Sequence, residues 1–373
     1  MKILGYPKHI KELDGIRGLA CLFVLTHHCF TGVLAVEVTG WSKSIIDFFS
    51  IFFLSGVDLF FVLSGFLVGG IIIDNYNSQN FLRVFYLRRI FRIFPVYYLL
   101  IISFIIGYFL VGDYKFFDDS LFKHRYNIWS YVVFIQSYVF GLFNNSGPLW
   151  LAPSWSVSVE EQFYLLTPFL ILLIGKRKAL YFILLGIVIA PFIRLFLLNN
   201  VGFYAMYMFF PARMDTLFWG VLLAYFLRNE SIRAKLRNFS LLIYMIILII
   251  LLSLYFKISI SLVDKFTSLS LLYTCIIWVI LEGESKKVKK FVSLRIFTYV
   301  GSISYAVYMF HQVINGLLHG FIFHSKPIIS DLDTILVTCL SVLITVGISH
   351  LSLKYFENPI RKHGLKYKYE KYL

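Results

Sequence analysis

The segment IDFFSIFFLSGVDLFFVLSGFLVGGIII, residues 46–73, determines the structural class of this chain. It is apolar along almost its whole length, and it exceeds the roughly 20 residues with which an α-helix crosses a hydrocarbon core of ~30 Å. Asp58 lies midway along it, where an ionisable group is costly. The segment therefore predicts a membrane-spanning helix with a carboxylate that needs an explanation.

Similar apolar runs recur along all 373 residues. Hydrophobic residues make up 59% of the chain and charged residues 15%, and the mean hydropathy is +0.78. A soluble domain carries about 25% charged residues, so this chain lacks the polar groups to cover a surface in water. We therefore predict an all-α polytopic protein of the lipid bilayer, with residues 1–373 as one transmembrane domain. Eleven apolar segments can be delimited: 18–36, 46–73, 93–111, 129–143, 158–174, 179–198, 213–227, 240–256, 266–282, 299–319 and 333–353.

Segment 129–143 is the weakest of the eleven. It has about 15 residues, which is marginal for a span, and it runs into the Pro- and Gly-containing stretch 145–148. We predict that it is re-entrant or lies at the outer face. About ten transmembrane helices then remain, and both termini are cytoplasmic.

The basic residues support this topology. Of the 35 Lys and Arg residues, 26 fall in the segments that the ten-helix arrangement places in the cytoplasm, as the positive-inside rule requires. The net charge of +15 is thus explained by membrane orientation, and we expect no nucleic-acid partner. The four cysteines fall inside apolar runs without a CxxC pair, which favours packed thiols over disulfides or metal ligands.

Two ionisable residues of the first span share one helix face. Arg17 and His28 are eleven residues apart, so they differ by about 20° around a helix and by about 16 Å along it. His27 points roughly 80° away from Arg17. A lone buried histidine is usually a hydrogen-bonded core residue, but the aligned arginine and the mid-bilayer depth make His28 a catalytic candidate.

A second histidine, His311, lies at similar depth in segment 299–319, behind Tyr305 and Tyr308 at i, i+3 spacing. His311, Tyr308 and Asp58 are further candidates for the site, although Asp58 can equally be the partner of a buried cation. Two histidines could bind a metal, but no third or fourth ligand stands at a recognisable spacing. We predict no metal.

Arg88, Arg89 and Arg92 precede Pro95 at the inner mouth of the third span. Arg89 and Arg92 share a helix face, guanidinium groups suit phosphates, and the start of a helix adds a favourable dipole. The three arginines therefore predict an anion site, the alternative being a topological anchor that needs charge but not this spacing.

Glu160 stands beside Trp155 and several serines at the outer start of segment 158–174. A carboxylate in a first helical turn can simply complement the helix dipole, or it can orient a hydroxyl group of a substrate. Gly65 and Gly69 predict close helix packing rather than chemistry.

Seven blocks of the chain, in order, resemble those of the acyltransferase-3 family of membrane acyltransferases. The first is LDGIRGL with the Arg-x10-His spacing of Arg17 and His28. Any one block is weak, but the ordered set is specific and covers nearly the whole chain. The other six are GVDLFFVLSGF (56–66), YLRRIFRIFP (86–95), SWSVSVEEQFY (154–164), PARMD (211–215), SYAVYMFH (304–311) and FENP (356–359).

The resemblance implies a bacterial inner-membrane O-acyltransferase with a ten-helix core. It implies cytoplasmic acyl-CoA, usually acetyl-CoA, as donor, and a surface glycan or lipid-linked sugar, such as an O-antigen polysaccharide, as acceptor. It also implies importance for Arg17, His28, Arg89 and Arg92. The SGNH domain that many members carry is not expected here, which leaves the need for an accessory protein open.

These residues suggest a mechanism. Arg89 and Arg92, with Arg88, would hold the phosphates of acyl-CoA while the pantetheine arm carries the thioester to His28. His28 would act as general base or accept the acyl group first, Arg17 would stabilise phosphate or oxyanion charge, and Glu160 would position the acceptor. The rival interpretation is a transporter or exporter of a glycan or small molecule, which would also carry mid-membrane His and Asp but gives no reason for the arginine pair.

Overall fold

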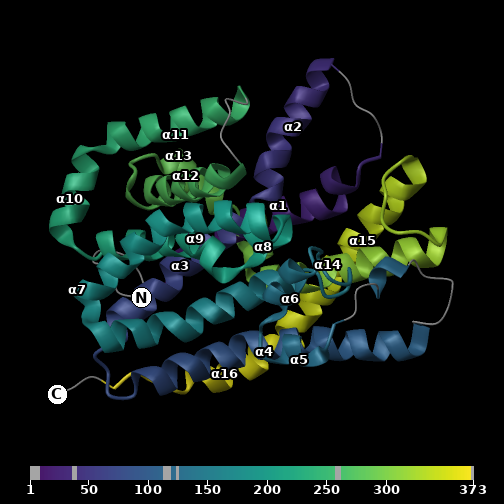
Figure 1. Cartoon of the computed structure of the whole chain (residues 1–373), viewed down its shortest axis with the longest axis horizontal. Helices are drawn as coiled ribbons and strands as arrows, with labels where there is room; N and C mark the ends of the chain where they lie inside the picture. Colours follow the sequence, from purple (N-terminus) through teal and green to yellow (C-terminus); the bar gives the residue numbers. More distant parts are fainter. Residues whose placement is uncertain (1–8, 36–39, 112–118, 123–125, 257–261, 371–373) are drawn as a thin grey trace. The chain divides into compact units, whose positions relative to one another are not determined.

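The computed structural model of the chain describes residues 9–35, 40–111, 119–122, 126–256 and 262–370. The structure is 84% helical and has no strand within these residues, apart from one isolated bridge between Leu34 and Ile329. The predicted all-α class is confirmed (Figure 1).

The main helices, labelled in Figure 1, are α1 (Lys11–Cys29), α2 (Gly40–Leu54), α3 (Gly56–Asn75), α4 (Phe81–Val111), α5 (Ile128–Val132), α6 (Gln136–Leu142), α7 (Ser154–Asn200), α8 (Phe203–Met208), α9 (Phe210–Phe226), α10 (Glu230–Asn238), α11 (Ser240–Tyr255), α12 (Leu262–Glu282), α13 (Lys286–Val292), α14 (Arg295–Phe323), α15 (Leu332–Leu351) and α16 (Asn358–Leu365). A π-helical turn, Ser352–Glu357, joins α15 to α16.

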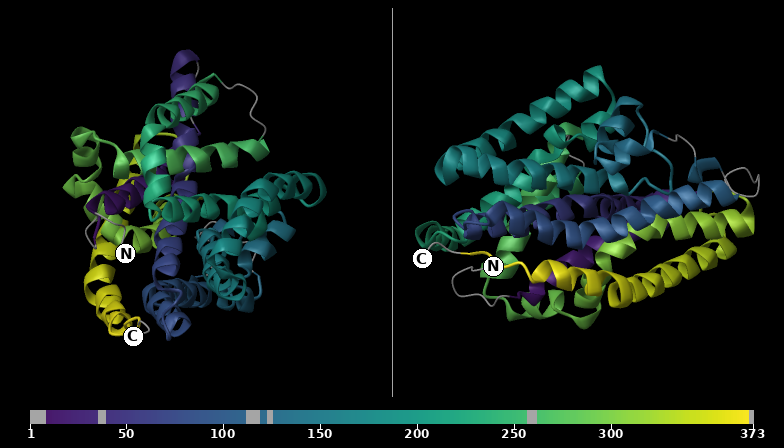
Figure 2. Two further views of the ribbon diagram at one scale, coloured as in Figure 1. Left: turned by 90° about the vertical axis from the view of Figure 1, so that its left-hand side faces the viewer. Right: turned by 90° about the horizontal axis from the view of Figure 1, so that it is seen from below.

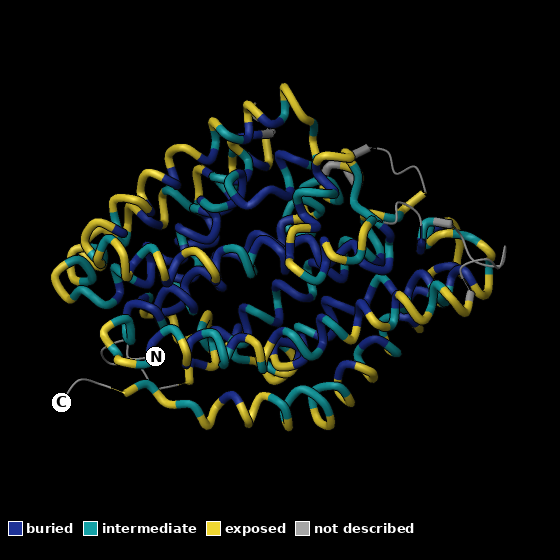
Figure 3. The backbone as a smooth tube through the Cα atoms, turned by 60° about the horizontal axis from the view of Figure 1, so that its bottom comes forward, coloured by how far each residue is buried: buried dark blue, intermediate teal, exposed yellow. Residues whose placement is uncertain are grey.

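Seven stretches of the described residues are long and apolar enough to cross a membrane, or eight if the bent pair α10 and α11 counts as one span. Seven of the ten predicted spans each overlap a helix of their own, and the spans 158–174 and 179–198 both lie in α7. The prediction of one helix over 46–73 is wrong, because α2 ends at Leu54 and α3 begins at Gly56. Along many helices, exposed turns alternate with buried ones, as expected of helices with one face in lipid (Figure 3). The protein is therefore a multi-pass membrane protein, and the number ten and the orientation of the termini remain predictions.

Two predicted helix starts are wrong. Helix α1 begins at Lys11 rather than residue 18, and α4 begins at Phe81 rather than residue 93. Hydropathy finds only the apolar part of a helix, whereas both helices begin with turns that carry charged residues. Helix α4 starts at Phe81, so the three arginines, Arg88, Arg89 and Arg92, lie well inside it. The prediction that the start of a helix adds a favourable dipole at these arginines is therefore wrong.

The predicted turn at 176–178 corresponds to a break inside α7. Gly175 has φ 76° and ψ 158°, a conformation that a residue without a side chain adopts easily. The break separates the two helices predicted over 158–174 and 179–198. Glu160 is the seventh residue of α7, beyond the first turn, so the dipole does not explain it.

The weak segment 129–143 forms two short helices, α5 and α6. The longer has seven residues, or about 10 Å, which is too short to cross a bilayer. Phe134, at φ 58°, lies between the two helices. This agrees with the prediction that the segment is not a span, while its place at the outer face stays a prediction.

The chain divides into two compact units, and the prediction of a single domain is not tested by this division. The first unit comprises residues 1–20, 55–76 and 159–301, and the second comprises residues 21–54, 77–158 and 302–373.

In the first unit, α3 packs directly on α9. A Cβ atom on Gly65 would lie 1.9 Å from the carbonyl oxygen of Leu217, and one on Gly220 would lie 2.0 Å from that of Val62. Gly69 lies against Val221 in the same way. The glycines let the two backbones touch, which confirms the packing role predicted for Gly65 and Gly69.

In the second unit, α16 and the tail that follows it lie along the first half of α4 (Figures 1 and 2). A Cβ atom on Gly364 would lie 2.8 Å from the side chain of Phe91. The Asn80 side chain donates to the carbonyl of Lys368 and accepts from the N–H of Glu370, both at 3.0 Å. The tail is thus fastened to the helix that carries the arginines.

The predicted orientation leads to a direct test by reporter tags. Tags after Lys178, Arg237 and Lys290 and at the C-terminus should report the cytoplasm, because these sites follow the basic loops. Tags near Asp119 and Lys326 should report the outside. Each tag is a single cysteine introduced at the named site, and labelling of that cysteine in intact cells by a membrane-impermeant thiol reagent provides the measurement. An outside signal after Lys178 would mean that 129–143 spans, and the ten-helix arrangement would be wrong.

Candidate active site

Helix α14 brings three predicted polar residues of the second unit into contact with other helices. The Tyr305 hydroxyl donates to the carbonyl of Ile93 on α4 at 2.9 Å. The Tyr308 hydroxyl lies 2.7 Å from that of Ser156, at the start of α7. His311 is buried at the same level of the helix. These contacts fix α14 in rotation, so that His311 has a defined direction.

His311 faces His28 of α1. Nδ1 of His28 lies 2.9 Å from Nε2 of His311, and the rings stack with centroids 5.1 Å apart. Each residue was a candidate from the sequence, but their direct pairing was not predicted. The only signal was their similar depth in two different spans.

The remaining contacts of His311 determine how the pair shares its hydrogens. Nδ1 of His311 lies 2.8 Å from the carbonyl oxygen of Tyr308 and 3.2 Å from that of Val307. Both are acceptors, so this nitrogen carries a hydrogen, and Nε2 of the neutral ring is an acceptor. His28 then donates through Nδ1, which leaves Nε2 of His28 with a free lone pair. Such a nitrogen can act as a base or as a nucleophile.

His27 occupies a different environment from His28. Its ring lies against Gly32, where an added Cβ atom would be 3.1 Å from Cε1 and Nε2. Its Nδ1 is buried without a hydrogen-bond partner among the described residues. The adjacent histidines therefore have different surroundings, and of the two only His28 is hydrogen-bonded to His311 among the described residues.

The three arginines of α4 have unequal surroundings. Arg88 donates through Nε and Nη2 to the carbonyl of Tyr367, at 3.0 and 2.5 Å, and its guanidinium lies 5.0 Å from the ring centroid of Tyr369. Arg89 is buried, and Arg92 is exposed. Burial raises the pKa of Tyr369, and the nearby positive charges of Arg88 and Arg89 oppose that rise. Arg88 thus joins α4 to the tail, and Arg92 is the most accessible of the three.

The other candidates belong to the first unit. Arg17 lies 3.6 Å from Asp14 in α1. Asp58 forms an ion pair with Arg213. It is thus the partner of a buried cation, which was the alternative interpretation of this residue. Glu160 is partly exposed on α7. The structure therefore brings together His28, His311 and Tyr308 in the second unit. Arg17, Asp58 and Glu160 belong to the first unit.

Two features bear on metals and thiols. Within the described residues, no three His, Cys, Asp or Glu side chains come close enough to hold a metal ion. All four cysteines are free thiols; three are buried as predicted, whereas Cys339 is exposed.

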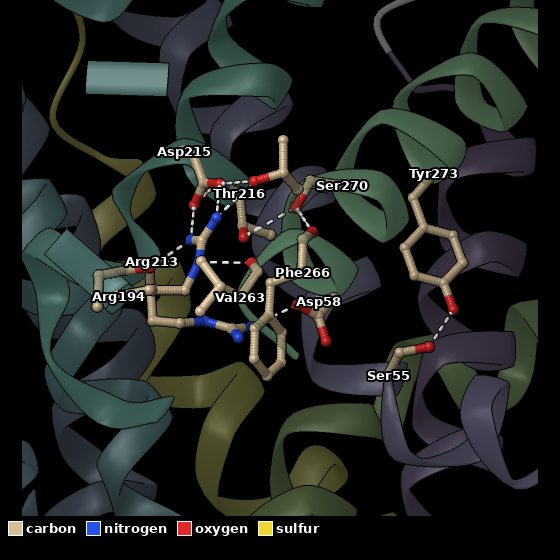
Figure 4. A network of polar contacts seen from close by, with 12 residues as sticks. Ser55, Asp58, Arg194, Arg213, Asp215, Thr216, Val263, Phe266, Ser270 and Tyr273 are labelled. Carbon is tan, nitrogen blue, oxygen red and sulfur yellow. Dashed lines mark hydrogen bonds and ion pairs between the residues drawn. The ribbon is translucent and has the colours of Figure 1, made fainter. Parts of the chain in front are cut away.

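The sequence reasoning missed a pair of buried arginines in the first unit, Arg194 and Arg213. Both lie in predicted spans, so the cost of an ionisable group in the bilayer, which made Asp58 a candidate, could also have identified these two arginines. Arg194 pairs with Asp215, and Arg213 pairs with Asp58 (Figure 4).

The profile of a family described as "Acyltransferase domain" matches residues 10–353, nearly the whole chain. The chain belongs to this acyltransferase family. The resemblance stated from the seven sequence blocks is thereby confirmed. The membrane spans and the family match together describe a membrane-embedded member of this acyltransferase family.

Similar proteins occur in Staphylococcus aureus. "Putative O-acetyltransferase SACOL0978" of strain COL is 23% identical over 380 residues, covering 96% of this chain and 58% of its own length. "O-acetyltransferase OatA" of strain NCTC 8325 is 25% identical over 381 residues, covering 96% and 58%. The chain thus spans about three fifths of the length of these relatives. No solved structure matches the chain.

Proposed function

We propose that this acyltransferase moves an acetyl group from cytoplasmic acetyl-CoA to a hydroxyl group of a bacterial surface glycan or lipid-linked sugar. The observation that carries the proposal is the His28–His311 pair, because it leaves Nε2 of His28 with a free lone pair inside a membrane helix bundle. The names of the two relatives support acetyl as the group and oxygen as the acceptor atom. A bacterial inner, cytoplasmic membrane is the expected location.

The chemistry follows from the hydrogen-bond pattern. In the direct route, Nε2 of His28 takes the proton of the acceptor hydroxyl while the oxygen attacks the thioester carbonyl. The C–O bond forms, the C–S bond breaks, and the thiolate of CoA takes the proton from His28. In the two-step route, Nε2 attacks the thioester carbonyl, a C–N bond forms, and the C–S bond breaks to release the thiolate of CoA. The acceptor oxygen then attacks the acetyl-imidazole, the C–O bond forms as the C–N bond breaks, and the hydroxyl proton passes to the thiolate. His311 stabilises positive charge on His28 in both routes by accepting the hydrogen bond from Nδ1.

The donor would enter at the mouth marked by the arginines of α4. Arg92 is the exposed member and Arg89 lies one turn before it, so these two are the expected phosphate contacts. Arg88 already donates two hydrogen bonds to Tyr367, and its contribution would be to hold the tail in place. Arg17 remains the proposed partner of the phosphate or oxyanion charge. Glu160 remains the proposed residue that positions the acceptor.

A labelling experiment tests the proposed function. Membranes that contain the wild-type chain or His28→Ala are incubated with radiolabelled acetyl-CoA and a cell-envelope glycan fraction. We expect label in the glycan with the wild-type chain and none above background with His28→Ala. Movement of unmodified glycan across the membrane, without label, would instead support the transporter.

The donor site gives a separate prediction for Arg92. Removing one charge-assisted phosphate contact costs roughly 1.5–3 kcal/mol, so Arg92→Ala should weaken CoA binding about ten- to a hundred-fold. Arg92→Lys should restore part of the loss, because charge returns without the planar fork. Equilibrium binding of CoA to the purified protein provides the measurement. Lost transfer at unchanged CoA affinity would make Arg92 a topological anchor.

A further inference from the structure

Two buried arginines of the first unit differ in how their N–H groups are satisfied (Figure 4). Arg194 of α7 donates through Nε to the carbonyl of Val263 and through Nη1 to that of Ala212, at 3.0 and 2.6 Å. It also makes two parallel bonds of 2.9 Å with Asp215 and a fifth bond with Thr267. All five donors of this guanidinium are thus used within the chain.

Arg213 of α9 is equally buried but far less well satisfied. Its Nη2 forms the ion pair with Asp58, whereas Nε and Nη1 are buried without a hydrogen-bond partner in the described part of the chain. Aromatic rings surround the group: the ring centroids of Phe266, Tyr207 and Phe61 lie 4.3, 5.4 and 5.6 Å from its central carbon. These rings interact with the cation but provide no acceptor in the plane of the N–H groups.

An unmet donor on a buried charged group is costly, and such groups in native proteins are normally satisfied. The contrast with Arg194 shows that this unit can build a complete set of acceptors when a structural arginine needs one. The open donors of Arg213 therefore indicate an acceptor atom that comes from outside the described part of the chain. A bound water molecule or an atom of a substrate would meet this need.

The charges of Arg213 and Asp58 limit the chemical class of ligand that could bind to this pair. Arg213 already forms an ion pair with Asp58, so an added anion would compete with this carboxylate for the same guanidinium in a buried place. A hydroxyl group avoids this, because it accepts from a guanidinium and donates to a carboxylate without changing the net charge. Adjacent hydroxyls of a sugar ring would serve both residues, with the apolar face of the ring toward the aromatic side chains of Phe266 and Tyr207.

We propose that Arg213 and Asp58 bind a hydroxyl-bearing sugar of the acceptor, in a site of the first unit lined by Phe266, Tyr207 and Phe61. The proposal rests on the proposed function, since it assigns the glycan acceptor to these residues. It makes Arg213 and Asp58 acceptor-binding residues, separate from the donor arginines of α4.

The test uses the double variant Asp58→Asn/Arg213→Gln, which removes both charges together and keeps polar groups of similar size. The substrates are radiolabelled acetyl-CoA and the cell-envelope glycan fraction. We expect the KM for the glycan to rise at least tenfold, because at least one charge-assisted hydrogen bond is lost. The KM for acetyl-CoA and the thermal midpoint in detergent should stay near their wild-type values. The single variant Arg213→Lys, which keeps the charge but not the planar guanidinium, should have a KM for the glycan between those of the wild type and the double variant.

Arg194→Lys is the matched control, since it perturbs an arginine of the same unit whose donors all have partners in the chain. It should lower the thermal midpoint without a selective rise in the KM for the glycan. An unchanged glycan KM in the folded double variant would overturn the proposal and leave a structural ion pair with bound water. A wild-type chain that labels no glycan would instead refute the proposed function itself.

Discussion

Replacing His28 by alanine should abolish acetyl transfer while membrane insertion and CoA binding stay near wild type. The substitution removes Nε2 of His28, the imidazole nitrogen that the His28–His311 pair leaves with a free lone pair. General-base catalysis alone contributes about 10²- to 10⁴-fold in rate. A loss beyond this range would favour the covalent acetyl-imidazole route. Initial rates at saturating acetyl-CoA, with expression matched by immunoblot, provide the measurement.

The adjacent histidine is the control for this variant. His27→Ala removes an imidazole of the same helix turn that lies against Gly32, so it should keep much of the activity. An inactive His27→Ala together with an active His28→Ala would show that the helical register is wrong, and the mechanism would fall with it. His311→Gln offers a second comparison, because its side-chain oxygen can still accept from Nδ1 of His28; it should be less damaging than His28→Ala.

A second large effect is expected on stability at Arg194. Arg194→Met leaves the carboxylate of Asp215 buried without its bidentate partner. Breaking a buried ion pair on one side costs about 3–5 kcal/mol. We expect this loss in the free energy of unfolding, measured in detergent by denaturant titration of the purified protein.

Arg233→Met is the matched control for this measurement. Arg233 also pairs with a buried carboxylate, that of Glu282, but Arg237 bonds to the same group at 2.8 Å. One partner therefore remains after the substitution, and the cost should stay below about 1 kcal/mol. Equal losses in the two variants would contradict the view that Asp215 depends on Arg194 alone for its charge balance.

The sequence was most informative about the helices in lipid. Apolar runs near 20 residues can hardly form anything else in a bilayer, because every backbone group must be hydrogen-bonded internally. For that reason 129–143 stood out as too short, and the break at Gly175 was expected near the basic residues 176–178. The charged first turns of α1 and α4 were missed because they carry no apolar signal.

The candidate site was predictable only along single helices. Spacing placed Arg17 and His28 on one face of α1 and distinguished His28 from His27. The contact between His28 and His311 joins residues 283 positions apart, so it depends on how α1 and α14 are rotated in the bundle. The attachment of Arg88 to Tyr367 is equally distant in sequence. The seven family blocks were the strongest predictor of function because they do not depend on packing.

The close contact of α1 with α14 has a consequence for how the protein is made. A Cβ atom on Gly18 would lie 1.9 Å from the carbonyl oxygen of Phe297, and one on Gly301 2.0 Å from that of Asp14, so the two backbones touch. A ribosome adds roughly 5–20 residues per second, so α1 would wait about 15–60 s in the membrane for its partner. The histidine pair therefore cannot form in a nascent chain until α14 is inserted.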